Sequence, residues 1–422
     1  MFTRTSTDTS RRDAQEPVCM NKPSPKRSKR RARLLRLAVV LMSVVFSIVV
    51  IELGCRVYLY FYSVDVIDGS EFWASCPPPF QGAPYFNEDF LKEAQACFKP
   101  VSGPEGANYL LFSDFEGEYF NIAESRRKTT DQPAGHTARI LLFGGSTVFC
   151  HQVPDRYTIA SYLQRLCNQR YGQIIKVENY GTPAMTAAQQ TARLRSIPIG
   201  PNDIVMFFDG DNDIFYPLYN ANVSGWLLDR GGHNGGPRKS AWFHQFLHPL
   251  AARLSGTSAI ADVLLTICER QPPKHLATKD SRDRLLADME EGYTNALLAA
   301  RAHATSHGGL FFHFLQPNLF ITSRPLSEYE EELILKDVRR WPAVDTVFRL
   351  GYPQLRNAIA SAGALGLVSH DISNALDNRA AGQEVYLDFL HLNHEGNALV
   401  ANAIFDKLTA DGLLGEKLAR LK

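Results

Sequence analysis

The chain has 422 residues, 45% of them hydrophobic and 21% charged, and a formal net charge of +1 at pH 7. This composition is ordinary for a globular protein. The chain is long enough for one large domain with insertions or for two smaller domains. A net charge so close to zero argues against a nucleic acid or another polyanion as the partner of the whole chain.

The first element in chain order is an apolar segment near the amino terminus. Residues 22–36 are rich in lysine and arginine, whereas residues 37–51 carry no charge and, with their apolar flanks, are long enough to cross a membrane. Because basic residues precede the span and few follow it, we predict a disordered basic cytoplasmic tail at 1–33 and a single-pass transmembrane anchor at 34–62. The rest of the chain would then lie on the extracytoplasmic, periplasmic side of the cytoplasmic membrane. A span directly after the tail also disfavours nucleic-acid binding by the tail.

A cleaved signal peptide and a lipoprotein are the two alternatives to an uncleaved anchor. The segment after the apolar run, Glu-Leu-Gly-Cys at 52–55, lacks the small-x-small pattern of a signal-peptidase site. Glu52 also interrupts the resemblance of Leu-Gly-Cys to a lipoprotein site. We therefore favour the uncleaved anchor.

The seven cysteines are spread widely, and no Cys-x-x-Cys or Cys/His spacing indicates a metal site. In an oxidising compartment Cys76 could pair with Cys97, and Cys150 could pair with Cys167. Free buried thiols are equally compatible with the sequence, so the pairing stays open.

The region after the anchor divides into an irregular part and a regular part. Residues 63–137 contain three consecutive prolines, scattered aromatic residues and no clear period, which predicts an irregular stalk or cap with a few short strands, such as 108–112. From 138 to 412 strands alternate with helices, which predicts a parallel sheet covered by helices on both faces. An insertion at 214–281 interrupts this alternation and could form a lid over the site.

The expected strands of the regular part are 140–143, 174–178, 204–208, 310–315 and 367–371. The expected helices are 159–171, 186–196, 282–306, 327–340, 352–362 and 395–410, with two more inside the insertion at 242–254 and 259–268. In a sheet of this kind the functional site lies beyond the carboxyl ends of the strands.

Four polar segments would meet at that edge. Gly-Gly-Ser-Thr at 144–147 follows the first strand, and Asn-Tyr-Gly-Thr at 179–182 follows the second. Asp-Gly-Asp-Asn-Asp at 209–213 follows the third strand, and Tyr-Leu-Asp-Phe-Leu-His-Leu-Asn-His at 386–394 precedes the last helix. Two glycines allow the chain to turn sharply before Ser146, where a helix could begin.

These segments supply each group that acyl transfer from an ester requires. Ser146 can act as the nucleophile, and Asp388 can orient His391 as its base, since the two are three residues apart. The amides of Ser146 and Gly181 and the side chain of Asn212 can donate hydrogen bonds to an oxyanion. No metal or cofactor is needed for this chemistry.

The four segments, in this order, resemble the sequence blocks of the SGNH (GDSL-like) hydrolase superfamily over residues 138–410. Two further stretches, 314–318 and 391–396, resemble membrane-anchored bacterial members. The resemblance implies a flavodoxin-like three-layer α/β/α sandwich with a parallel sheet. It also implies Ser146 as the nucleophile, Asp388 and His391 as the remaining triad members, and Ser146, Gly181 and Asn212 as the oxyanion hole. One departure is that the first block has Gly145 where many members have aspartate.

Several residues near these blocks have other interpretations. Asp209 and Asp211 could help to hold a divalent cation, but solvated turn carboxylates are the preferred interpretation because no other ligands cluster there. His394 is a second candidate base, and His391 is preferred for its spacing from the aspartate. Gly145, Asp213 and Gln316 are candidates for the substrate pocket.

The predicted function is a membrane-anchored serine esterase with no metal or cofactor. Resemblance and location suggest an O-acyl group on a carbohydrate or envelope glycan as one substrate, and a small-molecule ester as another. Two alternatives remain open. One is an O-acyltransferase that uses the same triad, and the other is a non-catalytic envelope-binding protein on the same fold.

Overall fold

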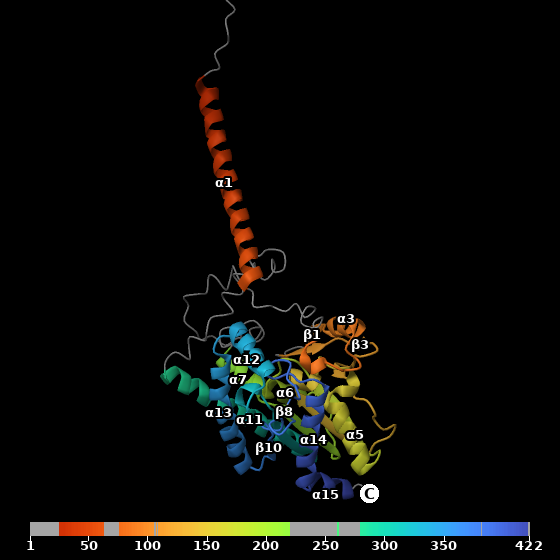
Figure 1. Cartoon of the computed structure of the whole chain (residues 1–422). Helices are drawn as coiled ribbons and strands as arrows, with labels where there is room; N and C mark the ends of the chain where they lie inside the picture. Colours follow the sequence, from red (N-terminus) through yellow and green to blue (C-terminus); the bar gives the residue numbers. More distant parts are fainter. Residues whose placement is uncertain are drawn as a thin grey trace, which may run out of the picture.

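The computed structural model describes most of the chain beyond its amino-terminal tail (Figure 1). The described residues are 25–62, 76–104, 107, 109–219, 260, 279–380 and 382–420, with the side chains of 25–33 and 57–62 excepted. The helices predicted at 242–254 and 259–268 therefore lie outside the described residues, apart from Ile260.

The amino-terminal helix α1 (Pro25–Tyr62) is continuous and longer than the predicted anchor. Its segment Leu34–Arg56 is long and apolar enough to cross a membrane, as a signal sequence also is, and it is not buried within the described structure. Residues 25–33, predicted to be disordered, are helical. Lysine, arginine and alanine are strong helix formers, and proline is tolerated at the first helical position.

The central sheet contains five parallel strands. They are β6 (Ala138–Gly144), β7 (Ile175–Gly181), β8 (Asp203–Asp209), β9 (Leu310–Leu315) and β10 (Ser369–Asp371). Their spatial order is β10-β9-β8-β6-β7, the flavodoxin-like order in which the first strand lies between the second and the third. Every residue of β8 is buried, as expected for a strand covered on both faces. The predicted α/β fold with a parallel sheet is confirmed.

Three short strands extend this sheet beyond β7. They are β3 (Phe115–Glu116), β4 (Asn121–Ala123) and β5 (Arg126–Arg127), and β5 pairs with β7 in antiparallel orientation. The segment predicted to be an irregular stalk or cap thus contributes to the sheet. Strands of two or three residues are too short to show an alternating pattern, so the sequence does not reveal them.

The rest of that segment packs beside the sheet. It contains η1 (Pro78–Phe80) and α3 (Glu88–Cys97), followed by a separate hairpin of β1 (Pro100–Ser102) and β2 (Leu110–Phe112). The hairpin contains part of the strand predicted at 108–112. Phe80 and Phe90 are buried in the same core as the central strands, which joins this region to the domain.

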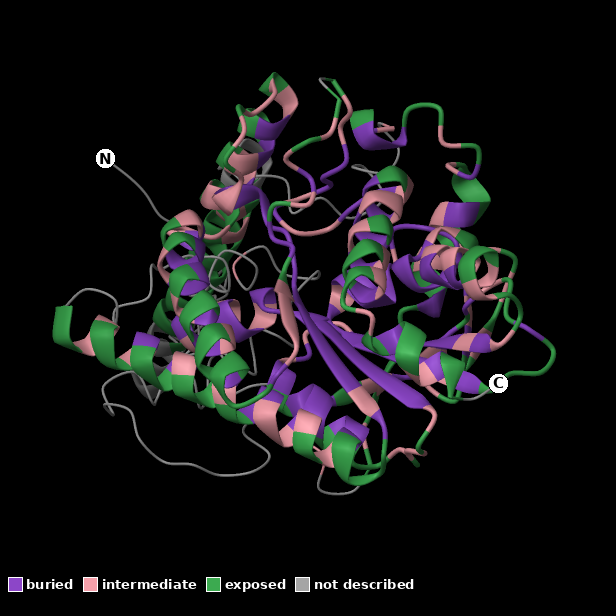
Figure 2. Cartoon of the chain, turned by 90° about the horizontal axis from the view of Figure 1, so that it is seen from below, coloured by how far each residue is buried: buried purple, intermediate pink, exposed green. Residues whose placement is uncertain are grey.

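Helices cover both faces of the sheet, as Figure 2 shows. On one face α5 (Ile159–Tyr171) packs against α14 (His394–Ala410), which contacts α15 (Leu413–Ala419) beyond the predicted end of the domain at 412. The other face carries α6 (Ala187–Leu194), α7 (Asp211–Leu218), α11 (Lys279–Ser306) and α13 (Val344–Ala364). This is the predicted three-layer arrangement.

The described cysteines are all free thiols. Neither pairing considered from the sequence is formed. Cys97 donates instead to the carbonyl of Ala94 at 3.3 Å, and Cys150 to the carbonyl of Thr147 at 2.7 Å. Both thiols are satisfied within their own turn of the chain.

Candidate active site

The turn that presents Ser146 lies at the carboxyl end of β6. Ser146 is the first residue of the short helix α4 (Ser146–Phe149), which follows Gly145. A Cβ atom on Gly144 would lie 2.3 Å from Cγ2 of Val148 and 2.5 Å from the carbonyl oxygen of Phe208. The chain can therefore turn this closely past β8 only with glycine at 144.

Ser146, His391 and Asp388 form one hydrogen-bonded chain. The Oγ atom of Ser146 lies 2.7 Å from Nε2 of His391, and Nδ1 of His391 lies 2.6 Å from Oδ2 of Asp388. The loop before α14 thus reaches the turn after β6. This is the geometry of a serine whose proton is taken by an oriented imidazole.

His391, together with two backbone amides, keeps Asp388 ionised. Its Oδ1 atom accepts the amides of Leu390 at 2.9 Å and His391 at 2.7 Å. Burial alone would raise the pKa of Asp388, but the charge of His391 and these hydrogen bonds outweigh burial and hold the pKa at about 2. A carboxylate that stays charged can hold one tautomer of His391 and stabilise its protonated form.

The side chain of Asn212 lies beside the serine turn. Asn212 follows β8 in the first turn of α7, and its Nδ2 atom donates to the carbonyl of Met185 at 2.9 Å. A Cβ atom on Gly145 would lie 2.5 Å from this Nδ2 atom. The second hydrogen of the amide group has no partner among the described residues, so it is available to a ligand.

The structure corrects the role predicted for Gly181. Its amide donates to Oδ1 of Asn179 at 2.9 Å. A Cβ atom at 181 would lie 2.4 Å from the amide nitrogen of Phe149. Gly181 therefore allows α4 to pack closely on β7, and its amide is already occupied.

Ala184, in the turn after β7, is a residue that the sequence analysis missed. Its φ of 67° is in the left-handed region that favours glycine, and the following carbonyl, of Met185, binds Asn212. Its amide has no hydrogen-bond partner in the described part of the chain. Only the positive φ singles it out, because an alanine in a loop carries no signal in the sequence.

Asp209, the last residue of β8, and Asp211 are both buried, so the prediction of solvated turn carboxylates is wrong. Asp209 accepts hydrogen bonds from Tyr293 and His313, at 2.5 and 3.2 Å. Asp211 accepts hydrogen bonds from Tyr352 at 2.8 Å, from Asn318 at 3.0 Å and from Gln316. Despite these bonds, burial raises the pKa of Asp211 to about 7.

Two candidate pocket residues also prove to have structural partners. Asp213 accepts the amide of Ala187, at the start of α6, at 2.9 Å, and burial followed by the charge of Asp209 raises its pKa. Gln316 is buried against Asp211 and lies 3.5 Å from Oγ1 of Thr147. Both side chains therefore hold the backbone and side chains around the site in place.

The two remaining histidines near the triad have different surroundings. Nδ1 of His394 lies 3.3 Å from the hydroxyl of Tyr85, whereas the histidine that contacts Ser146 is His391. The His151 ring lies edge-on to that of His391, with centroids 6.1 Å apart. Desolvation, followed by the charge of His391, lowers the pKa of His151 to about 3, so His151 is neutral at physiological pH.

Comparisons with known proteins give structural likeness only. No family model and no curated protein matches the sequence. An α/β hydrolase from the metagenome of Lake Arreo, Spain, is 13% identical, with a TM-score of 0.36 over 65% of this chain and 95% of that one. A lipolytic protein of the G-D-S-L family from Veillonella parvula is 14% identical, with a TM-score of 0.35 over 64% and 97%. An acetylxylan esterase from Geobacillus stearothermophilus is 11% identical, with a TM-score of 0.34 over 65% and 94%.

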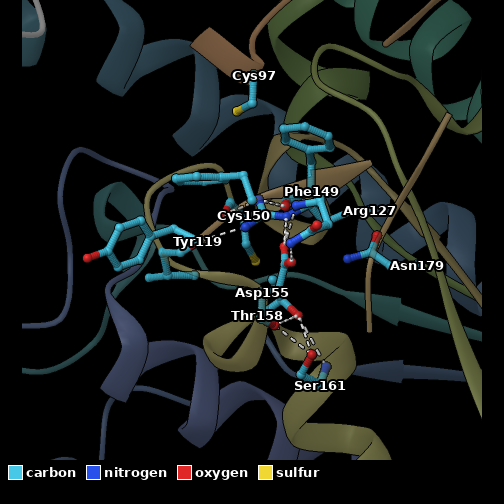
Figure 3. A network of polar contacts seen from close by, with 12 residues as sticks. Cys97, Tyr119, Arg127, Phe149, Cys150, Asp155, Thr158, Ser161 and Asn179 are labelled. Atoms are coloured by element: carbon cyan, nitrogen blue, oxygen red, sulfur yellow. Dashed lines mark hydrogen bonds and ion pairs between the residues drawn. The ribbon is translucent and has the colours of Figure 1, made fainter. Parts of the chain in front are cut away.

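Arg127 connects the antiparallel extension of the sheet to the serine helix (Figure 3). Its buried guanidinium contacts Asp155 at 2.5 Å and donates to the carbonyls of Phe149 and Cys150, both at 3.2 Å, and of Val153 at 2.8 Å. A cation at the carboxyl end of a helix is favourable, and here it also satisfies carbonyls that α4 leaves unpaired. The position of Ser146 therefore depends on β5.

One open cavity in the described part of the chain is separate from this site. Its volume is about 580 Å³, and residues of β3, β4, β5 and β7 line it, among them Arg126, Lys128 and Glu178. Ser146, Asp388 and His391 are not among the lining residues. Its charges are largely paired, since Glu178 contacts Arg126 at 3.0 Å and Lys176 at 2.9 Å. The cavity therefore does not alter the assignment of the site to the carboxyl edge of the sheet.

Proposed function

We propose that the protein is a serine esterase, with Ser146 as nucleophile, His391 as general base and Asp388 as the residue that orients the base. The hydrogen-bonded chain from Ser146 through His391 to Asp388 carries this proposal. The chain lies at the edge of the sheet where open α/β folds bind their ligands. The low pKa of Asp388 keeps it charged at any pH at which an esterase operates.

In the proposed reaction the serine is first acylated and then deacylated. As Oγ of Ser146 attacks the ester carbonyl, its proton passes to Nε2 of His391, and the tetrahedral intermediate forms. His391 then gives this proton to the leaving alcohol, and an acyl-serine remains. Water, deprotonated by His391, attacks the acyl-serine, and the proton returns to Ser146 as the acid leaves.

Three donors are suitable for the oxyanion. The amide of Ser146 lies at the start of α4, and Asn212 can offer its second amide hydrogen. The amide of Ala184 replaces that of Gly181 as the third donor in our proposal, because it is unpaired and lies beside the Asn212 contact. Donors of this kind act on charge that develops in the transition state.

The proposed substrates are O-acyl esters of carbohydrates or small molecules. We place the catalytic domain outside the cytoplasmic membrane, with segment 34–62 as its anchor. An acyl-serine can also pass its acyl group to a sugar hydroxyl, so an O-acyltransferase would use the same residues. The choice depends on whether water or an alcohol reaches the acyl-serine. Product analysis with an added sugar acceptor distinguishes the two outcomes.

The test uses the full chain in detergent with p-nitrophenyl acetate and butyrate. We expect Ser146→Ala to lower kcat by at least about 1,000-fold and to abolish labelling by a fluorophosphonate. Ser306→Ala is the matched control, because Ser306 bonds only within its own turn at the end of α11. Absence of turnover and of labelling in the unmodified protein would refute the proposal.

A further inference from the structure

Exposed apolar side chains gather at the catalytic edge of the domain. Outside α1, the large apolar side chains that are exposed in the described chain are Phe98, Val101, Leu110, Leu335, Leu365 and Leu413. The first three lie on or beside the β1–β2 hairpin. Leu335 lies on α12 (Glu328–Arg340), whose Asp337 accepts the amide of Phe389 in the catalytic loop at 3.0 Å.

The hairpin is linked to the triad by a short series of rings. The ring centroids of Phe98 and His151 are 5.6 Å apart, and those of His151 and His391 are 6.1 Å apart. Phe112, on β2, stacks at 5.0 Å on Phe149 of the serine helix. The exposed apolar surface therefore continues directly into the wall of the site.

The hairpin presents apolar groups on both of its faces. Val101 pairs with Leu111, and Ser102 pairs with Leu110, so Val101 and Leu110 point to opposite sides. A flat protein partner would cover only one of these sides. A lipid phase can contact the exposed groups on both sides of the hairpin, and the exposed Lys99 at its base suits anionic headgroups.

The chain enters the domain at this same edge. Asn393, two residues after His391, donates to the carbonyl of Pro79 at 2.6 Å, and Phe80 is buried. Residues 63–75 connect α1 to this point and span at most about 45 Å at full extension. In Figure 1 the hairpin and α12 lie at the end of the domain nearer to α1, and α15 lies at the far end.

From these observations we propose that the catalytic edge faces the membrane and that the β1–β2 hairpin enters its surface, so that the site takes an ester carried by a membrane amphiphile. This inference rests on the proposed esterase function. It narrows the substrate class from any O-acyl ester to esters whose acyl chain or acceptor is anchored in lipid. His151 and Phe98 would then line the path from the bilayer to Ser146.

The test compares a bilayer-embedded ester with a soluble one. The full chain is reconstituted into vesicles of phosphatidylcholine and phosphatidylglycerol, and p-nitrophenyl palmitate in the bilayer is compared with p-nitrophenyl acetate in the buffer. We expect the double variant Val101→Ser, Leu110→Ser to lose at least about tenfold in kcat/KM for the palmitate, since burial of each such side chain favours lipid contact. Turnover of the acetate should change less than about twofold, which also shows that the variant folds.

Exposed apolar residues at the opposite end provide the matched control. Leu365 caps the carboxyl end of α13 and Leu413 begins α15, both remote from the triad. The double variant Leu365→Ser, Leu413→Ser should retain turnover of both esters. Equal losses of palmitate turnover in the two double variants, or no loss in either, would overturn the inference and leave the acetate activity intact.

A second measurement does not depend on catalysis. Tryptophan is introduced by Leu110→Trp or by Leu365→Trp, and its fluorescence is followed in vesicles that contain brominated phosphatidylcholine. Because the chain already has four tryptophans, the unmodified protein is the reference. We expect the bromolipid to quench the fluorescence added by Leu110→Trp and not that added by Leu365→Trp. If the acetate is not hydrolysed at all, the esterase proposal fails, and this quenching alone decides whether the edge faces lipid. Equal quenching at the two positions, or none, would refute that orientation.

Discussion

The Oγ atom of Ser146 lies 2.7 Å from Nε2 of His391, although the two residues are 245 positions apart in the chain. The contact forms because α14, which follows His391, packs against α5, which follows the serine helix. Two turns at the same edge of the sheet are thereby brought together. Chemistry that depends on this contact can be tested by changing each partner without unfolding the domain.

Asp388→Asn tests whether the carboxylate orients His391. Asparagine keeps an oxygen for the amides of Leu390 and His391, but its amide group would hold His391 in the wrong tautomer. We expect kcat for p-nitrophenyl acetate to fall on the order of 10,000-fold, with little change in KM. The control is Asp411→Asn, since Asp411 forms a similar contact with His370, at 2.7 Å, at the far end of α14. Comparable activity in Asp388→Asn and the unmodified protein would contradict the proposed role.

Asn212 and Gly145 test the oxyanion site together. Loss of one oxyanion donor lowers kcat by about 100- to 1,000-fold, so we expect a loss of this size for Asn212→Ala. Gly145→Ala should lower kcat in the same direction, because the new Cβ atom would lie 2.5 Å from Nδ2 of Asn212 and displace it. Steady-state kinetics with p-nitrophenyl butyrate measure both effects.

The double variant Gly145→Ala, Asn212→Ala shows whether the two substitutions lower kcat by the same cause or by separate causes. If Gly145→Ala acts by moving the Asn212 amide, the double variant should be no slower than Asn212→Ala alone. Gly292→Ala serves as the control substitution, because a Cβ atom there meets nothing within 4 Å. Losses that multiply in the double variant would show that Gly145 acts independently of Asn212.

Arg127→Met tests the link between β5 and the serine helix. The change leaves the carboxylate of Asp155 without its cation in a buried site, which costs about 3 to 5 kcal/mol of the free energy of unfolding. Denaturant unfolding of the full chain in detergent measures this loss. Arg165→Met is the control, since the contact between Arg165 and Asp131 is solvent-exposed and should contribute little. A loss of similar size in the two variants would argue against a special role for Arg127.

The raised pKa of Asp337 predicts how the free energy of unfolding depends on pH. Burial, followed by the negative charge of Asp388, raises the pKa of Asp337 to about 8. A carboxyl group whose pKa is higher in the folded than in the unfolded chain contributes stability below its unfolded pKa, and this contribution is lost as the pH rises through the folded pKa. The protein should therefore lose stability between about pH 4 and pH 8 through this residue.

Asp337→Asn removes this titration but keeps the acceptor for the amide of Phe389. Between pH 5 and pH 8 we expect the stability of the variant, relative to the unmodified protein, to rise by at least about 1 kcal/mol, because one pKa unit corresponds to about 1.4 kcal/mol. Thermal unfolding at both pH values measures the difference, with Asp411→Asn as the control. Parallel pH profiles would show that Asp337 is not protonated in the fold.

The parts of the fold that the sequence predicts are those with long local patterns. The apolar run before Ser146 predicts a strand at 140–143, and β6 is Ala138–Gly144. Helix α5, at Ile159–Tyr171, has the predicted bounds, because its apolar residues recur with the helical period. The predicted start of α12 at Ser327 is its cap, where Ser327 and Glu330 form a capping box.

The sequence predicts less of the candidate site than of the fold. Ser146, Asp388 and His391 were named from the sequence and lie together, while their catalytic roles stay a prediction. Gly181 was named as a donor because glycine is suitable for close approach, but its amide is occupied by Asn179. The exposure of a carboxylate such as Asp211 cannot be read from a turn-like pattern, because burial depends on helices packed over it.

The sequence by itself determined the order of the five parallel strands along the chain, the apolar segment of α1, and the short spacing of Asp388 and His391, since each depends on residues near in the chain. Only the tertiary structure decided the antiparallel extension, the buried contact of Arg127 with Asp155, and the left-handed turn at Ala184. These features depend on segments that are far apart in sequence and meet only when the sheet and its helices pack. Local residue patterns hold no information about such distant partners until the core brings them together.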